Sequence, residues 1–157
     1  MKIKTVNEQT LSIWASFASQ VWRTNEQELI EKFRNNKFPY EFLYFSSSEE
    51  PIAWISLSFR HDYVEGCQNG PTAYLEGIFI SPNYRSQGIA EELLHFAEGW
   101  AKSRGISQLG SDAELDNLLS QKFHIKHGFR LSQKFHIKHG FREVSRTVHY
   151  VRDLNSE

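Results

Sequence analysis

The residues with the clearest chemical potential form a short basic loop, Arg85-Ser86-Gln87-Gly88-Ile89-Ala90. An apolar segment over 75–80 and a polar turn over 81–83 precede this loop, and apolar residues at three- and four-residue spacing follow it. This pattern predicts a strand, a loop and an amphipathic helix that Gly105 ends. The first backbone N–H groups of a helix have no partner within it. The loop therefore predicts an anion site whose ligand carries phosphates.

Two carboxylates stand out by their positions. Glu76 lies among apolar residues of the strand expected over 75–80, where a carboxylate is costly without a partner. Asp112 lies at the end of a strand expected over 107–112, where the crevice of an α/β sheet opens. Both are candidates for acid–base chemistry.

The composition narrows the class of protein. The chain has 157 residues, which predicts one domain over 1–157, and its 12 Phe, 6 Tyr and 4 Trp favour a packed, aromatic-rich core. A net charge of −1 argues against a non-specific nucleic-acid binder. The lone Cys67 excludes an internal disulfide and fits a reducing compartment. With no apolar leader or membrane-length run, we expect a cytoplasmic protein with no membrane partner.

Hydrophobic periodicity predicts the elements that position the loop. The expected helices cover 11–22, a segment after a capping box at Thr24 and Gln27, the segment after the basic loop, and a segment beginning at 116–117. The expected strands are 2–6, a hairpin of 41–46 with 52–59, then 75–80, 107–112 and 143–153. The order β-α-α-β-β-β-α-β-α-β predicts a mixed α/β domain.

A twelve-residue segment, LSQKFHIKHGFR, occurs twice in direct tandem, at 119–130 and 131–142. It is too short for a solenoid repeat and indicates a recent or engineered duplication. Twelve residues of helix would rotate the second copy by roughly 120°, so that Phe135 would miss the face used by Phe123. We expect the first copy to keep the helix and part of the second to form an extruded helix or loop. Alternatively, the second copy packs natively, or it exchanges between subunits as a domain swap.

The loop fits the pattern R/Q-x-x-G-x-G/A, and with its flanking strand and helix it resembles the acetyl-coenzyme A motif of the GNAT N-acetyltransferases. More narrowly, the chain resembles the aminoglycoside 6′-N-acetyltransferases. That likeness rests on Trp22, RHDYVEGC at 60–67, LEGIFI at 75–80, Ser111-Asp112, and Asn117 with SQK, His124 and Gly128-Phe129 after it. The repeated segment departs from this family.

The resemblance implies a GNAT fold and acetyl-coenzyme A as cosubstrate. It places the pyrophosphate on backbone N–H groups of 87–90, with Arg85 and Ser86 beside it. The pantetheine arm would follow Ile78, Phe79 and Ile80, with a contact to Asn117. An N–H near Phe79 would stabilise the developing oxyanion.

An aminoglycoside is a polycation, so the resemblance implies a site with carboxylates. The acidic residues expected around it are Asp62, Glu65, Glu76, Asp112, Glu114 and Asp116. Glu76 or Asp112 would bind the reactive ammonium and accept its proton. Trp22 and Tyr63 could stack on sugar rings, although Trp22 equally fits the core. Solvated or helix-capping charge is the plainer explanation of Asp62, Glu65, Glu114 and Asp116.

Many GNAT enzymes use a tyrosine in the last helix to protonate the leaving thiolate, and His124 occupies the matching position. It would donate that proton or only bind the cofactor, and His136 is its repeat. The pair His124 and His127 shares a helix face, but no nearby cysteine or carboxylate completes a metal site, so we expect no metal. Cys67 is interpreted as a loop or interface thiol.

The leading hypothesis is acetyl transfer to the 6′-amino group of aminoglycosides by direct attack in a ternary complex, giving antibiotic resistance. Its alternatives are an acetyltransferase for another amine, such as a polyamine or peptide, and a coenzyme A-binding module impaired by the duplication. The family resemblance also implies a homodimer.

Overall fold

The computed structural model describes residues 2–60, 72–114, 118–134 and 147–154. The chain divides into two compact units. The first contains Met1–Ser58 and Leu75–Ala97, and the second contains Phe59–Tyr74 and Glu98–Glu157. No helix in the described ranges is long and apolar enough to cross a membrane.

The four strands that lie wholly or mostly in the first unit follow one another in the sheet as they do in the chain. They are β1 (Ile3–Thr5), β2 (Tyr40–Phe45), β3 (Pro51–Arg60) and β4 (Thr72–Ile80), in the order β1-β2-β3-β4. The predicted hairpin is confirmed, because β2 pairs antiparallel with β3 and Phe42 faces Ile55 across it. β4 begins three residues before its predicted start at Leu75.

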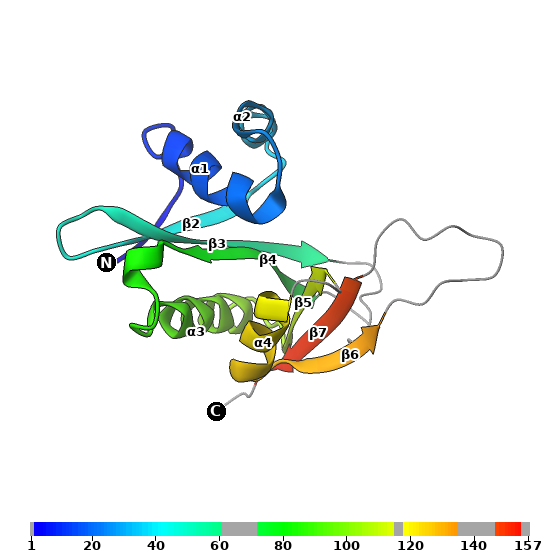
Figure 1. Cartoon of the computed structure of the whole chain (residues 1–157). Coiled ribbons are helices and arrows are strands. Elements are labelled where there is room, and N and C mark those ends of the chain that lie inside the picture. The colour runs from blue at the N-terminus through cyan, green and yellow to red at the C-terminus, as the bar shows by residue number, and fades with distance from the viewer. Residues whose placement is uncertain (1, 61–71, 115–117, 135–146, 155–157) are drawn as a thin grey trace. The chain divides into compact units, whose positions relative to one another are not determined.

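Two helices cover one face of these strands, and residues 89–97 of a third helix, α3 (Ile89–Lys102), cover the other (Figure 1). α1 (Leu11–Trp22) has the predicted bounds. α2 (Glu26–Arg34) begins differently from the prediction, because Asn25 and not Thr24 is its N-cap. The side chain of Asn25 accepts hydrogen bonds from the backbone N–H groups of residues 27 and 28 at 2.8 and 3.2 Å. An asparagine next to the helix outcompetes a threonine one residue further away.

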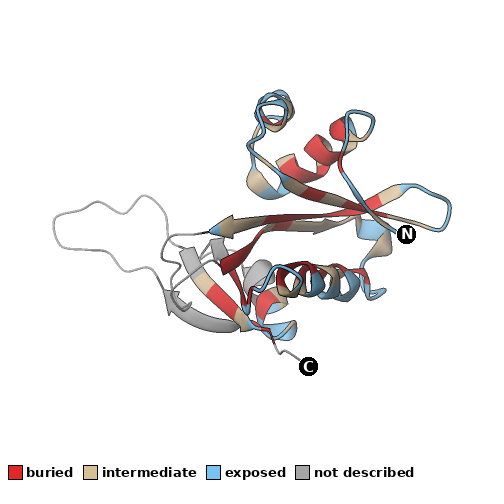
Figure 2. Ribbon diagram, turned by 180° about the vertical axis from the view of Figure 1, so that it is seen from behind, coloured by how far each residue is buried: buried red, intermediate tan, exposed pale blue. Residues whose placement is uncertain are grey.

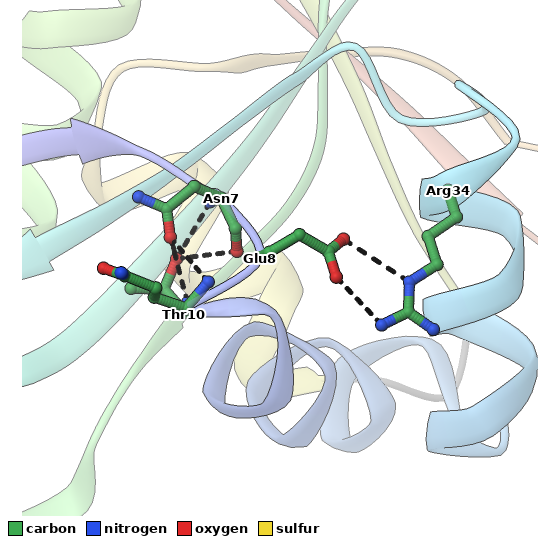
Figure 3. A network of polar contacts seen from close by, with 5 residues as sticks. Asn7, Glu8, Thr10 and Arg34 are labelled. Atoms are coloured by element: carbon green, nitrogen blue, oxygen red, sulfur yellow. Dashed lines mark hydrogen bonds and ion pairs between the residues drawn. The ribbon is translucent and has the colours of Figure 1, made fainter.

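Polar contacts secure the entry to α1 and join it to α2 (Figure 3). Asn7 Oδ1 accepts the backbone N–H of Thr10 at 3.1 Å. Arg34 of α2 donates to Glu8 through Nη2 at 2.9 Å and through Nε at 3.4 Å. The pair is exposed to solvent, and so it contributes little to stability.

The core of the first unit lies between the sheet and α1 and is rich in aromatic rings. The buried side of α1 is red in Figure 2. Trp14 is fully buried and lies 5.1 Å from the ring of Phe33 and 5.4 Å from that of Phe38, between centroids. The buried members of this core are Val6, Leu11, Trp14, Ala15, Phe17, Ala18, Leu29, Leu43 and Trp54.

After β4 the chain makes a short 3-10 turn, η1 (Pro82–Tyr84), and then forms α3 (Ile89–Lys102). The apolar face of α3 is buried through Leu93, Leu94 and Ala97. The predicted stop at Gly105 is confirmed: its φ is 74°, and its N–H donates to the carbonyl of Lys102 at 3.0 Å. Glycine adopts this left-handed conformation without steric cost.

The second unit contains β5 (Gln108–Glu114), α4 (Leu118–Lys126), β6 (Arg130–Lys134) and β7 (Thr147–Asp153). Its strands lie in the order β5-β7-β6, and both pairings are antiparallel. β7 overlaps the predicted final strand, whose first four residues lie outside the described ranges. β6 was not predicted.

The two copies of the repeat begin in different secondary structures. LSQK at 119–122 belongs to α4, as predicted for the first copy, whereas LSQK at 131–134 belongs to β6. Gly128, at φ 86°, ends the helix, and residues 130–134 then pair with β7. Strand pairing therefore overrides the local preference of identical residues. Residues 135–142, and with them the predicted extrusion, lie outside the described ranges.

Candidate functional site

The loop after β4 is held against the end of that strand. Arg85 Nε donates to the carbonyl of Ile80 at 2.8 Å, and the guanidinium lies 5.6 Å from the centroid of the Phe79 ring. Residues 85–88 are all exposed. Ser86 and Gly88 both have positive φ angles, 63° and 82°. The predicted basic loop is thus a defined, solvent-facing turn.

The loop ends where α3 begins. The N–H of Glu92 donates to the carbonyl of Gly88 at 3.1 Å, which marks the first turn of the helix. The N–H groups of residues 89–91 therefore belong to the turn that lacks intrahelical acceptors. No atom lies within 4 Å of the position of a Cβ on Gly88, so backbone conformation and not crowding requires glycine there. This open helix start beside Arg85 fits a phosphate group.

Glu76, the carboxylate predicted in β4, has the partner that its position requires. Ser58 of β3 donates through Oγ to Glu76 Oε2 at 2.5 Å, and the Glu76 side chain is partly exposed. Trp22 donates through Nε1 to the backbone carbonyl of Glu76 at 2.9 Å. Sequence reasoning did not identify Ser58, although its place in the adjacent strand of a predicted hairpin offered a weak signal.

The residue after Glu76 shows why β4 can lie against aromatic rings. A Cβ on Gly77 would come within 2.5 Å of Cη2 of Trp54 and 3.1 Å of Nε1 of Trp22. Trp22 also meets Trp54 edge to face at 5.0 Å and stacks on Phe38 at 5.0 Å. The structure therefore places Trp22 at the margin of the core. Its stacking on a sugar ring remains a prediction.

The segment predicted to accompany the pantetheine arm, residues 78–80 of β4, is partly exposed. Phe79 stacks on Phe17 of α1, with their centroids 5.0 Å apart. One face of this segment is thus committed to the core.

His124 and Asp112 both belong to the second unit. Asp112 pairs with His149 between β5 and β7. His124 is 3% exposed and its Nε2 lies 2.7 Å from Oγ of Ser111. Its ring stacks on Tyr150 at 4.4 Å. Ser111 holds the imidazole in one orientation, a partner that sequence reasoning missed.

Six other predicted site residues lie outside the described ranges: Asp62, Tyr63, Glu65, Asp116, Asn117 and His136. Within the described ranges, no three His, Cys, Asp or Glu residues gather as metal ligands.

An unpredicted carboxyl group, that of Glu41 in β2, is buried in the first unit with 2% of its surface exposed. Trp14 and Trp54 donate through Nε1 to its Oε1 at 2.8 and 2.9 Å, and Ser56 donates to its Oε2 at 2.5 Å. Burial raises its pKa from 4.5 to about 8, and these hydrogen bonds only partly offset that effect. Alternation with buried Leu43 was the one signal for its inward position.

Comparison with known proteins shows which family has this arrangement of strand, loop and helix. A model of the acetyltransferase (GNAT) family matches residues 7–129. The chain belongs to the GNAT acetyltransferase family. Enzymes of this family use acetyl-coenzyme A, and the mixed α/β fold with its loop between β4 and α3 is the GNAT fold. The predicted fold, family and acetyltransferase class are confirmed.

Several similar proteins are named as aminoglycoside 6′-N-acetyltransferases. An aminoglycoside N(6′)-acetyltransferase type 1 from Acinetobacter baumannii is 35% identical over 82% of this chain and 90% of its own length. The crystal structure of the 6′-N-acetyltransferase AAC(6′)-Ih from Acinetobacter baumannii has a TM-score of 0.79 at 31% identity, covering 90% of this chain and 97% of that one. AAC(6′)-Iy in complex with the bisubstrate analogue CoA-S-monomethyl-acetylneamine has a TM-score of 0.75 at 28% identity, over 89% and 97% of the chains.

Proposed function

We propose that this GNAT enzyme transfers the acetyl group of acetyl-coenzyme A to the 6′-amino group of aminoglycoside antibiotics. The observation that carries the proposal is the exposed loop at the start of α3, in a chain that resembles 6′-N-acetyltransferases over nine-tenths of their length. Direct attack in a ternary complex needs no acyl-enzyme, and the enzyme contributes mainly orientation and electrostatics. Acetylation of the drug would give resistance.

The loop residues form the part of the proposed site that binds the acetyl donor, acetyl-coenzyme A. The N–H groups of 87–90 would bind the pyrophosphate, with Arg85 and Ser86 adding charge and a hydroxyl. Arg85 is already anchored to the end of β4 through Nε, which leaves its guanidinium oriented without further loss of freedom. Ile78, Phe79, Ile80 and Asn117 would accompany the pantetheine arm. Acetyl-coenzyme A supplies the thioester, and no metal takes part in this proposal.

Carboxylates form the part of the proposed site that binds the acetyl acceptor, the aminoglycoside. Glu76, oriented by Ser58, would bind the reactive ammonium and, directly or through water, accept its proton. Asp112 is the second candidate for the same role, with Glu65, Tyr63 and Trp22 as further substrate contacts. His124, held by Ser111, would return a proton to the leaving thiolate or hydrogen-bond the cofactor.

The repeat is proposed to be an insertion into a single GNAT domain. The family model ends at residue 129, one residue before the first copy ends. A homodimer in the cytoplasm is part of the same proposal. Removing residues 131–142 leaves a chain with one copy of the segment, which then reads directly into Glu143.

The test is to incubate the enzyme with acetyl-coenzyme A and either kanamycin or spermidine, and to follow the release of free thiol. We expect turnover with kanamycin, little with spermidine, and a loss of about 10²-fold or more in kcat/KM for Glu76→Gln. Preference for spermidine would instead support a polyamine acetyltransferase. Cofactor binding without turnover, with activity gained by deleting 131–142, would support a module impaired by the repeat.

A further inference from the structure

The buried Glu41 carboxyl joins elements that lie far apart in the chain. Its Oε1 accepts the indole N–H of Trp14 from α1 and that of Trp54 from β3, at 2.8 and 2.9 Å. Its Oε2 is bound by Ser56 at 2.5 Å. A buried carboxyl group is costly unless such donors surround it. The indole N–H groups of Trp14 and Trp54, which come from different elements, therefore share Oε1 of Glu41 as their hydrogen-bond acceptor.

The Trp54 side chain contacts both Glu41 and β4, the strand that carries Glu76 of the proposed site. The end of its ring opposite the N–H lies against β4, 2.5 Å from the position of a Cβ on Gly77. The same ring meets Trp22 edge to face at 5.0 Å and 86°. Trp22 in turn donates to the backbone carbonyl of Glu76 at 2.9 Å. Because an indole is rigid, the anchor at its N–H also sets the end that touches β4.

We propose that Glu41 is a positioning residue for the amine side of the site. Its carboxyl group holds the Trp54 indole in the orientation that places Trp22 and the Glu76–Gly77 segment. Glu41 acts through these neighbours and contacts neither substrate, and the inference rests on the proposed function. A carboxyl that served stability alone would leave this segment of β4 unchanged when it is replaced.

Steady-state kinetics with kanamycin and acetyl-coenzyme A test the proposal. Glu41→Leu removes the acceptor of both indoles and should raise KM for kanamycin about tenfold, with a change of less than about twofold for acetyl-coenzyme A. Glu41→Gln should restore the wild-type value, because its carboxamide oxygen accepts both indole N–H groups and its NH₂ donates to Ser56. If Glu41→Leu does not fold, Trp54→Phe replaces it, because phenylalanine lacks the N–H that binds Glu41 and its smaller ring reaches less far toward β4.

Gln108→Leu is the matched control. Gln108 is buried in the second unit, which does not contain Glu41, and it donates to Asp153 at 2.6 Å, so its loss removes a partly buried hydrogen bond. This variant should leave the ratio of the two KM values unchanged. The proposal is overturned if Glu41→Leu and Gln108→Leu alter both KM values alike, or if Glu41→Gln is as damaging as Glu41→Leu.

A second readout does not depend on activity. The four tryptophans give four indole N–H signals in a ¹⁵N–¹H spectrum. In Glu41→Leu the signals of Trp14, Trp54 and Trp22 should shift, whereas Trp100 in the second unit should not. A Trp22 signal as unchanged as that of Trp100 overturns the proposal. If the wild type shows no turnover, the proposed function fails, and the Trp22 signal alone then decides whether Glu41 positions this segment.

Discussion

Replacing Glu41 with glutamine should change how the stability of the protein depends on pH. Burial raises the pKa of this carboxyl group in the folded protein to about 8, against 4.5 in the unfolded chain. For a carboxyl group with a raised folded pKa, the unfolded state loses its proton first, so the folded state is progressively disfavoured as the pH rises. The contribution of the protonated group to stability is complete below about pH 4.5 and lost by about pH 8.

The magnitude follows from the two pKa values. A difference of about 3.5 units at 1.36 kcal/mol per unit corresponds to about 4 to 5 kcal/mol between pH 4.5 and 8. Glutamine keeps the neutral hydrogen bonds and cannot ionise. The free energy of unfolding of Glu41→Gln, minus that of the wild type, should therefore rise by about 1.4 kcal/mol per pH unit from pH 5 to 8 and level off above pH 8.

Urea unfolding at pH 5, 6, 7, 8 and 9, followed by circular dichroism, measures this difference, and subtraction removes the titration of all other groups. Glu8→Gln is the matched control, because Glu8 is exposed and its hydrogen bond with Arg34 lowers its pKa. Its stability contribution is present above the unfolded pKa, so its difference curve should be flat from pH 5 to 8. A flat curve for Glu41→Gln as well would refute the reasoning, since the buried carboxyl would then be ionised throughout.

Three further experiments test local features of the structure. Gly77→Ala places a methyl group against an indole ring and should lower the free energy of unfolding by about 1–3 kcal/mol. Gly99→Ala, in open space within α3, should instead raise the free energy of unfolding by about 0.5–1 kcal/mol. Equal effects of the two substitutions in urea unfolding would contradict this packing. Gly88→Ala strains a left-handed backbone and should raise KM for acetyl-coenzyme A about tenfold, with an unchanged KM counting against the loop as the phosphate site. Asn25→Ala should cost about 1 kcal/mol and Thr24→Ala clearly less, and a reversed order in thermal unfolding would restore the capping box predicted from sequence.

Elements with strong local signals were predictable. The apolar spacing of α1 and α3 and the alternation in the β2–β3 hairpin depend on residues close in the chain, and their observed bounds differ little from the predicted ones. The loop from Arg85 to Ala90 was predicted for the same reason, because its chemistry follows from the helix that it begins. The cap of α2 was wrong by one residue, since neighbouring polar residues compete for the same N–H groups.

The partners of the site residues could not be predicted. Ser58 beside Glu76, Ser111 beside His124 and the two indoles on Glu41 are contacts between residues 13 or more positions apart. Such pairs depend on strand register and helix packing, which no local pattern encodes.

The repeated segment shows most directly what the sequence determines and what the tertiary structure decides. The sequence alone determined that the two LSQK segments are chemically identical. Only the tertiary structure decided that one segment is helical and the other a strand, because the second can pair with β7. Local propensity is worth a few tenths of a kcal/mol per residue, and the hydrogen bonds of a strand ladder outweigh it.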